Sequence, residues 1–372
     1  MSADYRNRPF RLDGIDVRRL TLPLAAPLVT GRQSYRLREL LVLRVRIRVD
    51  GRIQHGWGEA APLPGWNEAG LDNLDDLAAL AESLGGAGGR RSLNELLDNE
   101  PELDARPALR FGIECSVLDA LARAAGVALV SALAEESGLE AANRVAVQYT
   151  LGDCDAPAAI DALDGARRAG YTHAKLKVGA RSMRADLDRI GAIAAAHPDL
   201  TLRLDANGAW SLEEALAVLA GLPPERVEWV EQPVPDADFD ALLARHDRAG
   251  PAIAADESVC SPERAAALIG SGRLGAVVVK PAALGGLDRA AGLFARAREA
   301  GVAVMISNLM ESAIGRAAVA HLAAAWPCIP GPHGLATGRW FAQDVAPGAD
   351  RISEAWLHLR AGPGLGFDPV LD

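Results

Sequence analysis

The chain has 372 residues, of which 49% are hydrophobic and 24% are charged, and its formal net charge at pH 7 is -10. This length exceeds what one compact core usually holds, so we expect one large domain and a smaller one. The acidic balance argues against nucleic-acid partners and anionic membrane surfaces, because phosphate groups are bound by clustered cations. No segment has the uninterrupted apolar length of a membrane span, and the first residues lack the apolar core of a secretory signal.

The four cysteines, Cys115, Cys154, Cys260 and Cys328, are scattered along the chain. They have neither the CxxC spacing of a zinc site nor the spacing of a disulfide framework. We therefore expect reduced thiols in a cytoplasmic protein. Composition leaves open whether the chain forms a homo-oligomer.

The N-terminal region is rich in strand patterns. IDVRRLTLPL, ELLVLRVRIRVD and HGWGEAAPL show alternating or β-branched residues that are interrupted by Gly and Pro. Loops are expected over residues 30–38 and 63–67. Helical spacing follows, most clearly in ALRFGIECSVLDALARAAG, which ends at a glycine. These patterns predict an α+β domain over residues 1–140.

From residue 141 an apolar strand and an amphipathic helix alternate. Seven such units begin with the strands VAVQYT, HAKLKV, LTLRLDA, VEWVEQP, PAIAADE, GAVVVKP and VAVMISN. Strands that are apolar throughout are buried on both faces, as parallel sheets require. With a weak eighth strand around Gly334, the pattern predicts a (β/α)7β TIM-type barrel over residues 141–345. A doubly wound sheet is the main rival, but no Gly-rich phosphate loop follows VAVQYT. Residues 346–372 contain no further unit and are expected to return to the first domain, which then caps the barrel.

Five polar residues end successive apolar runs in this region. They are Lys177, Asp205, Glu231, Asp256 and Lys280, at intervals of 28, 26, 25 and 24 residues. Each interval fits one strand and one helix, and the carboxyl ends of barrel strands meet at one rim. Taken singly, each residue has an ordinary alternative, such as a turn former, a solvated loop charge or a helix cap. Together they predict that three carboxylates and two ammonium groups converge on one site.

The chemistry of this set points to a metal ion flanked by bases. Three carboxylates on one rim would repel one another unless a cation joined them. Oxygen ligands suit Mg²⁺, with Mn²⁺ as the alternative, and no His or Cys accompanies them as zinc would favour. Such an ion binds a substrate carboxylate, while Lys177 and Lys280 would approach its α-carbon from opposite sides. Lys175 points the same way as Lys177, and its ammonium disfavours the charged form of Lys177. Arg203 shares a face with Asp205 and needs a carboxylate partner, from the protein or from a bound acid.

The motifs around these residues resemble those of the enolase superfamily. KxK at residues 175–177, DAN at 205–207, EQP at 231–233, DES at 256–258 and VVVKP at 277–281 look most like its muconate-lactonizing-enzyme subgroup. GWGEAAPLPGW and RFGIECSVLDALAR resemble signatures of the capping domain in that family. The resemblance therefore runs over nearly the whole chain.

The resemblance implies an enzyme that binds a small carboxylate substrate and abstracts its α-proton with the help of Mg²⁺. Under it, the metal ligands are Asp205, Glu231 and Asp256. Lys177 and Lys280 are the catalytic lysines, and Lys175 supports them.

Several reactions of the superfamily are disfavoured by the sequence. Mandelate-racemase-like members carry a histidine base on the seventh strand, whereas this chain has MISN at residues 305–308. Dipeptide epimerases hold a substrate ammonium with a DxD pair at the eighth strand, whereas this chain has GLAT at residues 334–337. Substrates without a free α-amine remain, such as those of o-succinylbenzoate synthases, N-acylamino acid racemases and muconate cycloisomerases.

The segment SNLMESAIG, residues 307–315, resembles the o-succinylbenzoate synthase loop in which a helix N-terminus receives the succinyl group. An ordinary helix cap is the alternative. The resemblance implies dehydration of 2-succinyl-6-hydroxy-2,4-cyclohexadiene-1-carboxylate, a lyase reaction of menaquinone biosynthesis. Lys177 would act as base and then as acid, and Lys280 would stabilise the enediolate. Substrate contacts are implied for Arg203, Asn207, Ser307, Glu311, Ser312 and Trp66.

The sequence also has to be compared with two alternatives to dehydration: another reaction of the subgroup, and a barrel without enzymatic activity. Glu39 and Leu40 stand where many relatives have Gly after the Arg, and that loop faces the substrate, so racemisation and cycloisomerisation stay open. A barrel kept only for binding would not require all five polar positions, yet all five are present.

Overall fold

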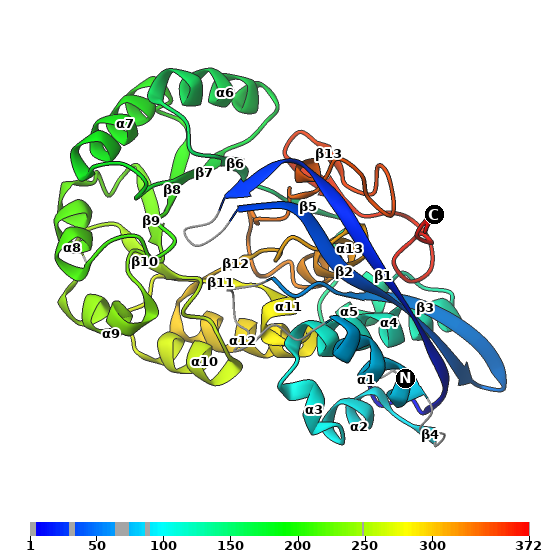
Figure 1. Ribbon diagram of the computed structural model, residues 1–372. Coiled ribbons are helices and arrows are strands. Elements are labelled where there is room, and N and C mark those ends of the chain that lie inside the picture. Colours follow the sequence, from blue (N-terminus) through cyan, green and yellow to red (C-terminus); the bar gives the residue numbers. More distant parts are fainter. Residues whose placement is uncertain (1–4, 30–33, 64–73, 86–89, 248, 372) are drawn as a thin grey trace.

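A computed structural model of the chain describes residues 5–29, 34–63, 74–85, 90–247 and 249–371. It contains a parallel barrel sheet surrounded by helices and, beside it, an antiparallel sheet with its own helices (Figure 1). The predicted fold class is therefore confirmed. None of the described helices combines the length and apolar character needed to cross a membrane.

The N-terminal part is a four-stranded antiparallel sheet covered by helices. Its strand order is β3-β2-β1-β4, with bounds β1 (Phe10–Val29), β2 (Ser34–Val49), β3 (Arg52–Ala60) and β4 (Arg90–Arg91). The helices are α1 (Leu74–Gly85), α2 (Leu93–Asp98), α3 (Pro101–Asp104), α4 (Pro107–Ala125) and α5 (Leu129–Ser137). Helix α4 is buried over most of its length and contacts β2 and β3.

Glycines allow α4 to lie directly against β3. A Cβ atom on Gly58 would lie 2.0 Å from the carbonyl oxygen of Gly112, and one on Gly56 would lie 2.1 Å from that of Ser116. No larger residue fits at either position without moving the helix. The glycines of the GWGEA motif therefore fix the position of β3 and of Glu59, which follows them.

The second part is a seven-stranded parallel sheet in the order β12-β11-β10-β9-β8-β7-β6. Its strands are β6 (Tyr149–Leu151), β7 (His173–Lys177), β8 (Thr201–Asp205), β9 (Val227–Glu231), β10 (Ala252–Ala255), β11 (Ala276–Val279) and β12 (Ala303–Ile306). The intervening and following helices are α6 (Ala156–Arg168), α7 (Met183–Ala196), α8 (Leu212–Gly221), α9 (Asp236–Arg245), α10 (Pro262–Gly270), α11 (Pro281–Leu284), α12 (Leu287–Ala300) and α13 (Ala313–Ala325). The chain thus advances by βα units, as the alternating pattern predicted.

The predicted eighth strand closes this sheet. The N–H of Gly334 donates to the carbonyl of Ile306 at 2.9 Å, and the N–H of Gln148 donates to the carbonyl of His333 at 3.0 Å. His333 and Gly334 therefore bridge the first and last strands in parallel pairing. The barrel is closed by a bridge of two residues rather than by a full strand.

The C-terminal tail contacts both parts of the molecule. Strands β13 (Arg351–Ser353) and β14 (Trp356–His358) form a hairpin that pairs with β5 (Arg144–Ala146) at the start of the barrel, after the short helix η1 (Gly338–Trp340). Beyond it, the N–H of Leu365 donates to Asp119 of α4 at 2.7 Å. The domain boundaries near residues 140 and 345 stay predictions.

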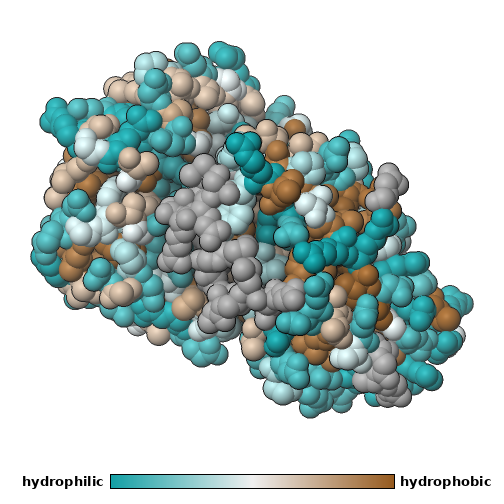
Figure 2. Space-filling view, in the orientation of Figure 1, coloured by the Kyte–Doolittle hydropathy of each residue, from teal (hydrophilic) through white to brown (hydrophobic). Residues whose placement is uncertain are grey.

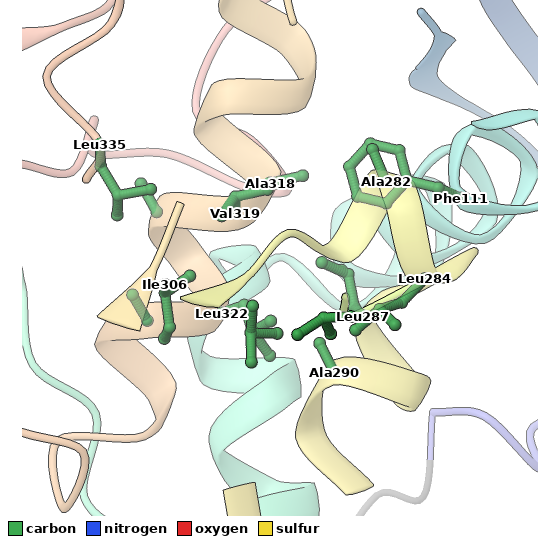
Figure 3. Close-up of a cluster of buried hydrophobic side chains, with 14 of the residues drawn as sticks. Phe111, Ala282, Leu284, Leu287, Ala290, Ile306, Ala318, Val319, Leu322 and Leu335 are labelled. Atoms are coloured by element: carbon green, nitrogen blue, oxygen red, sulfur yellow. The ribbon is translucent and has the colours of Figure 1, made fainter. Parts of the chain in front are cut away.

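One hydrophobic core extends through both parts. Figure 3 shows buried side chains from α4, α11, α12, β12 and α13 that belong to it, among them Phe111, Ala282, Leu287, Ile306 and Leu322. The surface view in Figure 2 shows hydrophilic residues spread over the outer helices of the barrel. The four cysteines are free, as their spacing predicted.

Candidate active site

The five polar residues lie on one rim of the barrel. Lys177, Asp205 and Glu231 are the last residues of β7, β8 and β9, and Asp256 and Lys280 directly follow β10 and β11. The register pairs Lys177 with Asp205, and Asp205 with Glu231. The spacing in the sequence thus translates into neighbouring positions at the carboxyl ends of the strands, where barrel enzymes carry their reactive groups.

Lys175 lies between two of the carboxylates. Its Nζ is 2.7 Å from Oε1 of Glu231 and 2.9 Å from Oδ2 of Asp205. Burial alone would lower the pKa of Lys175, but the surrounding carboxylates of Asp205, Glu231 and Asp256 outweigh it and raise this pKa. Lys175 therefore serves as a fixed positive charge among the acids.

The acidic groups themselves show how crowded the site is. Burial acts to raise the pKa of Asp205, but Lys175, Lys177 and Lys280 together hold it below its usual range. Burial raises the pKa of Glu231 well above its usual range, and Asp205 and Asp256 add to this although Lys175 opposes it. The charges of the described groups are thus not fully balanced around Glu231.

The residues present fit a divalent metal ion. Oε2 of Glu231 and Oδ1 of Asp256 are buried and have no hydrogen-bond partner among the described groups. Within that part of the chain, no three His, Cys, Asp or Glu side chains have the spacing of a preformed metal site, and the ammonium of Lys175 lies between Asp205 and Glu231. Two orphaned carboxylate oxygens beside a third carboxylate are the donor set that Mg²⁺ prefers.

The two remaining lysines have different partners. Nζ of Lys177 donates to the amide oxygen of Asn207 at 2.6 Å, and its side chain is 27% exposed. Nζ of Lys280 donates to Oδ2 of Asp256 at 2.7 Å, and its side chain is 11% exposed. A neutral amide accepts the hydrogen bond from Lys177, whose Nζ lies 4.0 Å from Oδ2 of Asp205, whereas a carboxylate accepts the hydrogen bond from Lys280.

Lysine occurs nowhere else in the sequence. Positions 175, 177 and 280 hold its only three copies, and arginine supplies all the others of the 39 basic side chains. Arginine keeps its proton in proteins, whereas a lysine ammonium is compact and loses its proton when its surroundings favour the neutral amine. The chain thus uses lysine only at the candidate site, a signal that was readable from the sequence and that motif analysis missed.

Arg203 finds its carboxylate partner in the protein. Its Nε donates to Oε2 of Glu228 at 2.6 Å, its Nη1 donates to the side chain of Gln148 at 2.8 Å, and its guanidinium lies 3.9 Å from the ring centroid of Trp229. Glu228 is thus the protein carboxylate that the sequence predicted as one alternative. A substrate contact of Arg203 stays a prediction.

Glu311 and Ser312, which were expected to receive a substrate group, contact the protein instead. Ser312 caps α13, but its N–H donates to Oε1 of Glu59 at 2.8 Å and its hydroxyl donates to the same carboxylate. The N–H of Gly315 also donates to Glu59, at 3.1 Å. Glu311 is fully buried and accepts the N–H of Leu309 at 2.7 Å. A carboxylate does occupy the helix N-terminus, as the dipole favours, but it comes from β3.

Glu59 was not among the predicted site residues, and its ionisation gives a test of this contact. Burial raises the pKa of Glu59 to about 7, and nearby Glu311 adds to this, although the hydrogen bonds from Ser312 oppose it. Between the pKa of the unfolded chain and 7, the folded protein therefore holds a proton that the unfolded chain has released. The protonated Glu59 therefore contributes at most about 3 kcal/mol to the free energy of unfolding, and this contribution is lost as the pH rises through 7. Glu59→Gln should flatten this slope in urea unfolding between pH 5 and 8, and an unchanged slope would assign it to other groups.

Two further contacts hold the N-terminal part over the barrel rim. Arg38 is buried and donates to the carbonyls of Met310 at 3.1 Å and Pro62 at 2.7 Å. A small apolar cluster lies at the same place and joins Leu63, Ala283, Leu309 and Tyr35. Ser307 lies at the end of β12 with its hydroxyl 3.2 Å from the carbonyl of Gly334, and it stays a candidate substrate contact. Trp66 lies outside the described residues.

A family model for enolase C-terminal domain-like proteins matches residues 158–372. The chain belongs to the enolase superfamily. Within it, an o-succinylbenzoate synthase from Thermosynechococcus vestitus is 33% identical over 347 residues, which cover 91% of this chain and 96% of that relative. A chloromuconate cycloisomerase from a Pseudomonas species is 28% identical over 329 residues, which cover 87% and 88%. The superfamily member described here is therefore an enzyme whose relatives include lyases and isomerases.

Solved structures of other superfamily members share the fold. The muconate lactonizing enzyme of Pseudomonas fluorescens, complexed with muconolactone, has a TM-score of 0.83 at 22% identity and covers 96% of each chain. The dipeptide epimerase of Methylococcus capsulatus, complexed with Mg and a dipeptide, has a TM-score of 0.81 at 26% identity and covers 96% of this chain and 99% of its own. Small-molecule substrates and magnesium are thus features of these relatives.

Proposed function

We propose that this chain is a Mg²⁺-dependent o-succinylbenzoate synthase, which dehydrates 2-succinyl-6-hydroxy-2,4-cyclohexadiene-1-carboxylate in menaquinone biosynthesis. The near full-length similarity to an o-succinylbenzoate synthase supports this choice. So does the absence of an acidic residue at positions 334–337, where a substrate ammonium would need one. The enzyme is expected in the cytoplasm.

The different partners of the two lysines carry the proposal. A racemase needs a proton acceptor on each face of the α-carbon, whereas a dehydratase needs one. Nζ of Lys177 donates to the neutral amide of Asn207, and the carboxylate oxygen Oδ2 of Asp205 lies 4.0 Å from it. Nζ of Lys280 instead donates directly to Oδ2 of Asp256 at 2.7 Å. One base and one fixed charge fit dehydration better than two-sided racemisation.

Each site residue has a separate role in the proposed dehydration. Asp205, Glu231 and Asp256 would hold Mg²⁺, which when bound neutralises negative charge at the substrate carboxylate. Lys177 removes the proton from the carbon that bears this carboxylate, and the ammonium of Lys280 stabilises the resulting enediolate. Lys177 then passes the same proton to the hydroxyl group on the neighbouring carbon. Water leaves, and the ring becomes aromatic.

Two reactions are alternatives to dehydration: racemisation of N-succinylamino acids and muconate-type cycloisomerisation. Both reactions would use the same metal ligands and the same two lysines. Cycloisomerisation is supported by the chloromuconate cycloisomerase relative, which is 28% identical to this chain over 329 residues. Substrate comparison is therefore the direct test.

The test is a comparison of kcat/KM for the cyclohexadiene substrate, N-succinyl amino acids and cis,cis-muconate. We expect the cyclohexadiene to exceed the others by at least about 100-fold, since the pocket discriminates among transition states. Lys280→Arg keeps the positive charge but cannot act as a base. It should retain dehydration, and the unmodified protein should exchange deuterium only into the N-succinyl enantiomer whose α-proton faces Lys177. A reversed substrate ranking, or exchange of both enantiomers by the unmodified protein, would rule out the proposal.

A further inference from the structure

A chain of hydrogen bonds leads from Lys177 to an acidic residue that no role above uses. Nζ of Lys177 donates to Oδ1 of Asn207 at 2.6 Å, and Nδ2 of Asn207 donates to Oε1 of Glu257 at 3.0 Å. The side chain of Asn207 is therefore held from both ends. Its oxygen faces an ammonium group and its nitrogen faces a carboxylate.

Charge dictates the orientation of this amide. An ammonium group only donates hydrogen bonds, so Lys177 requires the oxygen of the amide. The amide nitrogen then faces Glu257 and donates to its Oε1. Without Glu257, the amide of Asn207 would lose the partner that keeps its oxygen toward Lys177.

The backbone on both sides of this chain is fixed. Asn207 has a φ of 46°, in the left-handed region that asparagine tolerates better than most residues, and its N–H donates to Oδ1 of Asp205 at 3.0 Å. The N–H groups of Asp256 and Ser258, on either side of Glu257, both donate to Oε1 of Gln232, at 3.1 and 3.0 Å. Hydrogen bonds thus join the DAN, EQP and DES motifs, and the side chain of Glu257 extends from the DES motif to Asn207 of the DAN motif.

We infer that Glu257 is a positioning residue for proton transfer by Lys177, and that it acts through Asn207. The inference rests on the proposed role of Lys177. It also gives Asn207 a function other than the substrate contact expected from the sequence. Because a neutral amide accepts the hydrogen bond from Lys177, this arrangement fixes the nitrogen 4.0 Å from Oδ2 of Asp205, without the direct hydrogen bond to a carboxylate that holds Lys280.

The three lysines of the chain allow a direct spectroscopic test on the metal-free protein. Labelling with ¹³C,¹⁵N-lysine should give one Cε–Hε correlation for each of Lys175, Lys177 and Lys280, and Lys→Arg variants assign them. In Glu257→Leu, the Lys177 correlation should shift or broaden more than that of Lys280, whose charge also acts on Glu257, and the Lys175 correlation should stay in place. Glu213→Leu, an exposed position on α8, is the matched control and should move none. An unmoved Lys177 correlation in Glu257→Leu would overturn the inference.

Turnover gives the second test. Glu257→Leu should lower kcat about 10- to 100-fold, as misplacement of a reacting group does. KM should stay within about twofold, since Glu257 acts on the proton-transfer step through Asn207. Glu257→Gln, whose carbonyl still accepts from Asn207, should recover most of the rate. Asn207→Gly keeps the left-handed backbone but removes the amide, and adding Glu257→Leu to it should cost nothing further.

The outcomes separate this inference from the proposed function. Full additivity of the two substitutions, or no recovery in Glu257→Gln, would show that Glu257 acts independently of Asn207 and would overturn the inference. Failure of the unmodified protein to convert the cyclohexadiene would instead reject the proposed function. The lysine correlations would still decide whether Glu257 positions Lys177 in that case, because they need no substrate.

Discussion

Lys177→Ala is expected to lower turnover of the cyclohexadiene substrate by about 10⁴-fold, the upper end of what a general base contributes. The large effect follows because the same amine removes the α-proton and returns it to the leaving hydroxyl. The side chain of Lys177 lies on the barrel rim and is 27% exposed, and its ammonium donates to Asn207. Neither Lys175 nor Lys280 replaces it, because the ammonium of each donates a hydrogen bond directly to a carboxylate. Steady-state kinetics measure the loss.

Two controls distinguish lost chemistry from lost structure. Lys177→Arg keeps a positive charge and should be nearly as inactive, because a guanidinium does not give up its proton. Circular dichroism and Mg²⁺ binding by calorimetry should match the unmodified protein for both variants. A small alkylamine should restore part of the activity of Lys177→Ala, since the vacated position opens to the rim. Substantial activity of Lys177→Arg without added amine would remove Lys177 from the role of base.

The residues on the rim of the barrel could be predicted because their positions follow from the order of strands and helices along the chain. Residues such as Asp205 and Glu231 end strands of five residues each, and one helix separates successive strands. Parallel strands joined by helices leave little freedom in where their carboxyl ends lie. Even the closing bridge at Gly334 could be inferred, since seven strands leave a gap that one more segment must fill.

Contacts between the two parts of the molecule were not predictable in this way. Glu59 and Ser312 are separated by 253 positions, and nothing in the local pattern of either segment indicates the other. The helix N-terminus at Ser312 was expected to receive the succinyl group of a substrate, and the structure places the carboxylate of Glu59 there. Sequence alone could not decide between a substrate and Glu59. The partner of Arg203 was undecided for the same reason, since Glu228 lies on the neighbouring strand only once the register is known.

Glu231→Gln is expected to abolish the stabilisation of the protein by Mg²⁺. Ligand binding to the folded state alone adds about 2.7 kcal/mol at a concentration 100 times the dissociation constant. Oε2 of Glu231, like Oδ1 of Asp256, is buried without a hydrogen-bond partner among the described groups, so a cation would supply the partner that it lacks. Replacing this carboxylate by an amide removes both the charge and one oxygen donor. Thermal unfolding at pH 8, after chelation and after Mg²⁺ addition, measures the difference.

The same substitution should leave the metal-free protein as stable as before, or more so. Burial and the carboxylates of Asp205 and Asp256 raise the pKa of Glu231, so its ionised form destabilises the folded state, and glutamine carries no such charge. Glu228→Gln, on the same strand, is the matched control because it weakens the partner of Arg203. It should lower the metal-free stability yet keep the full gain on adding Mg²⁺. If Glu231→Gln kept that gain, Glu231 would not be a metal ligand, and the buried carboxylates would need another cation to balance them.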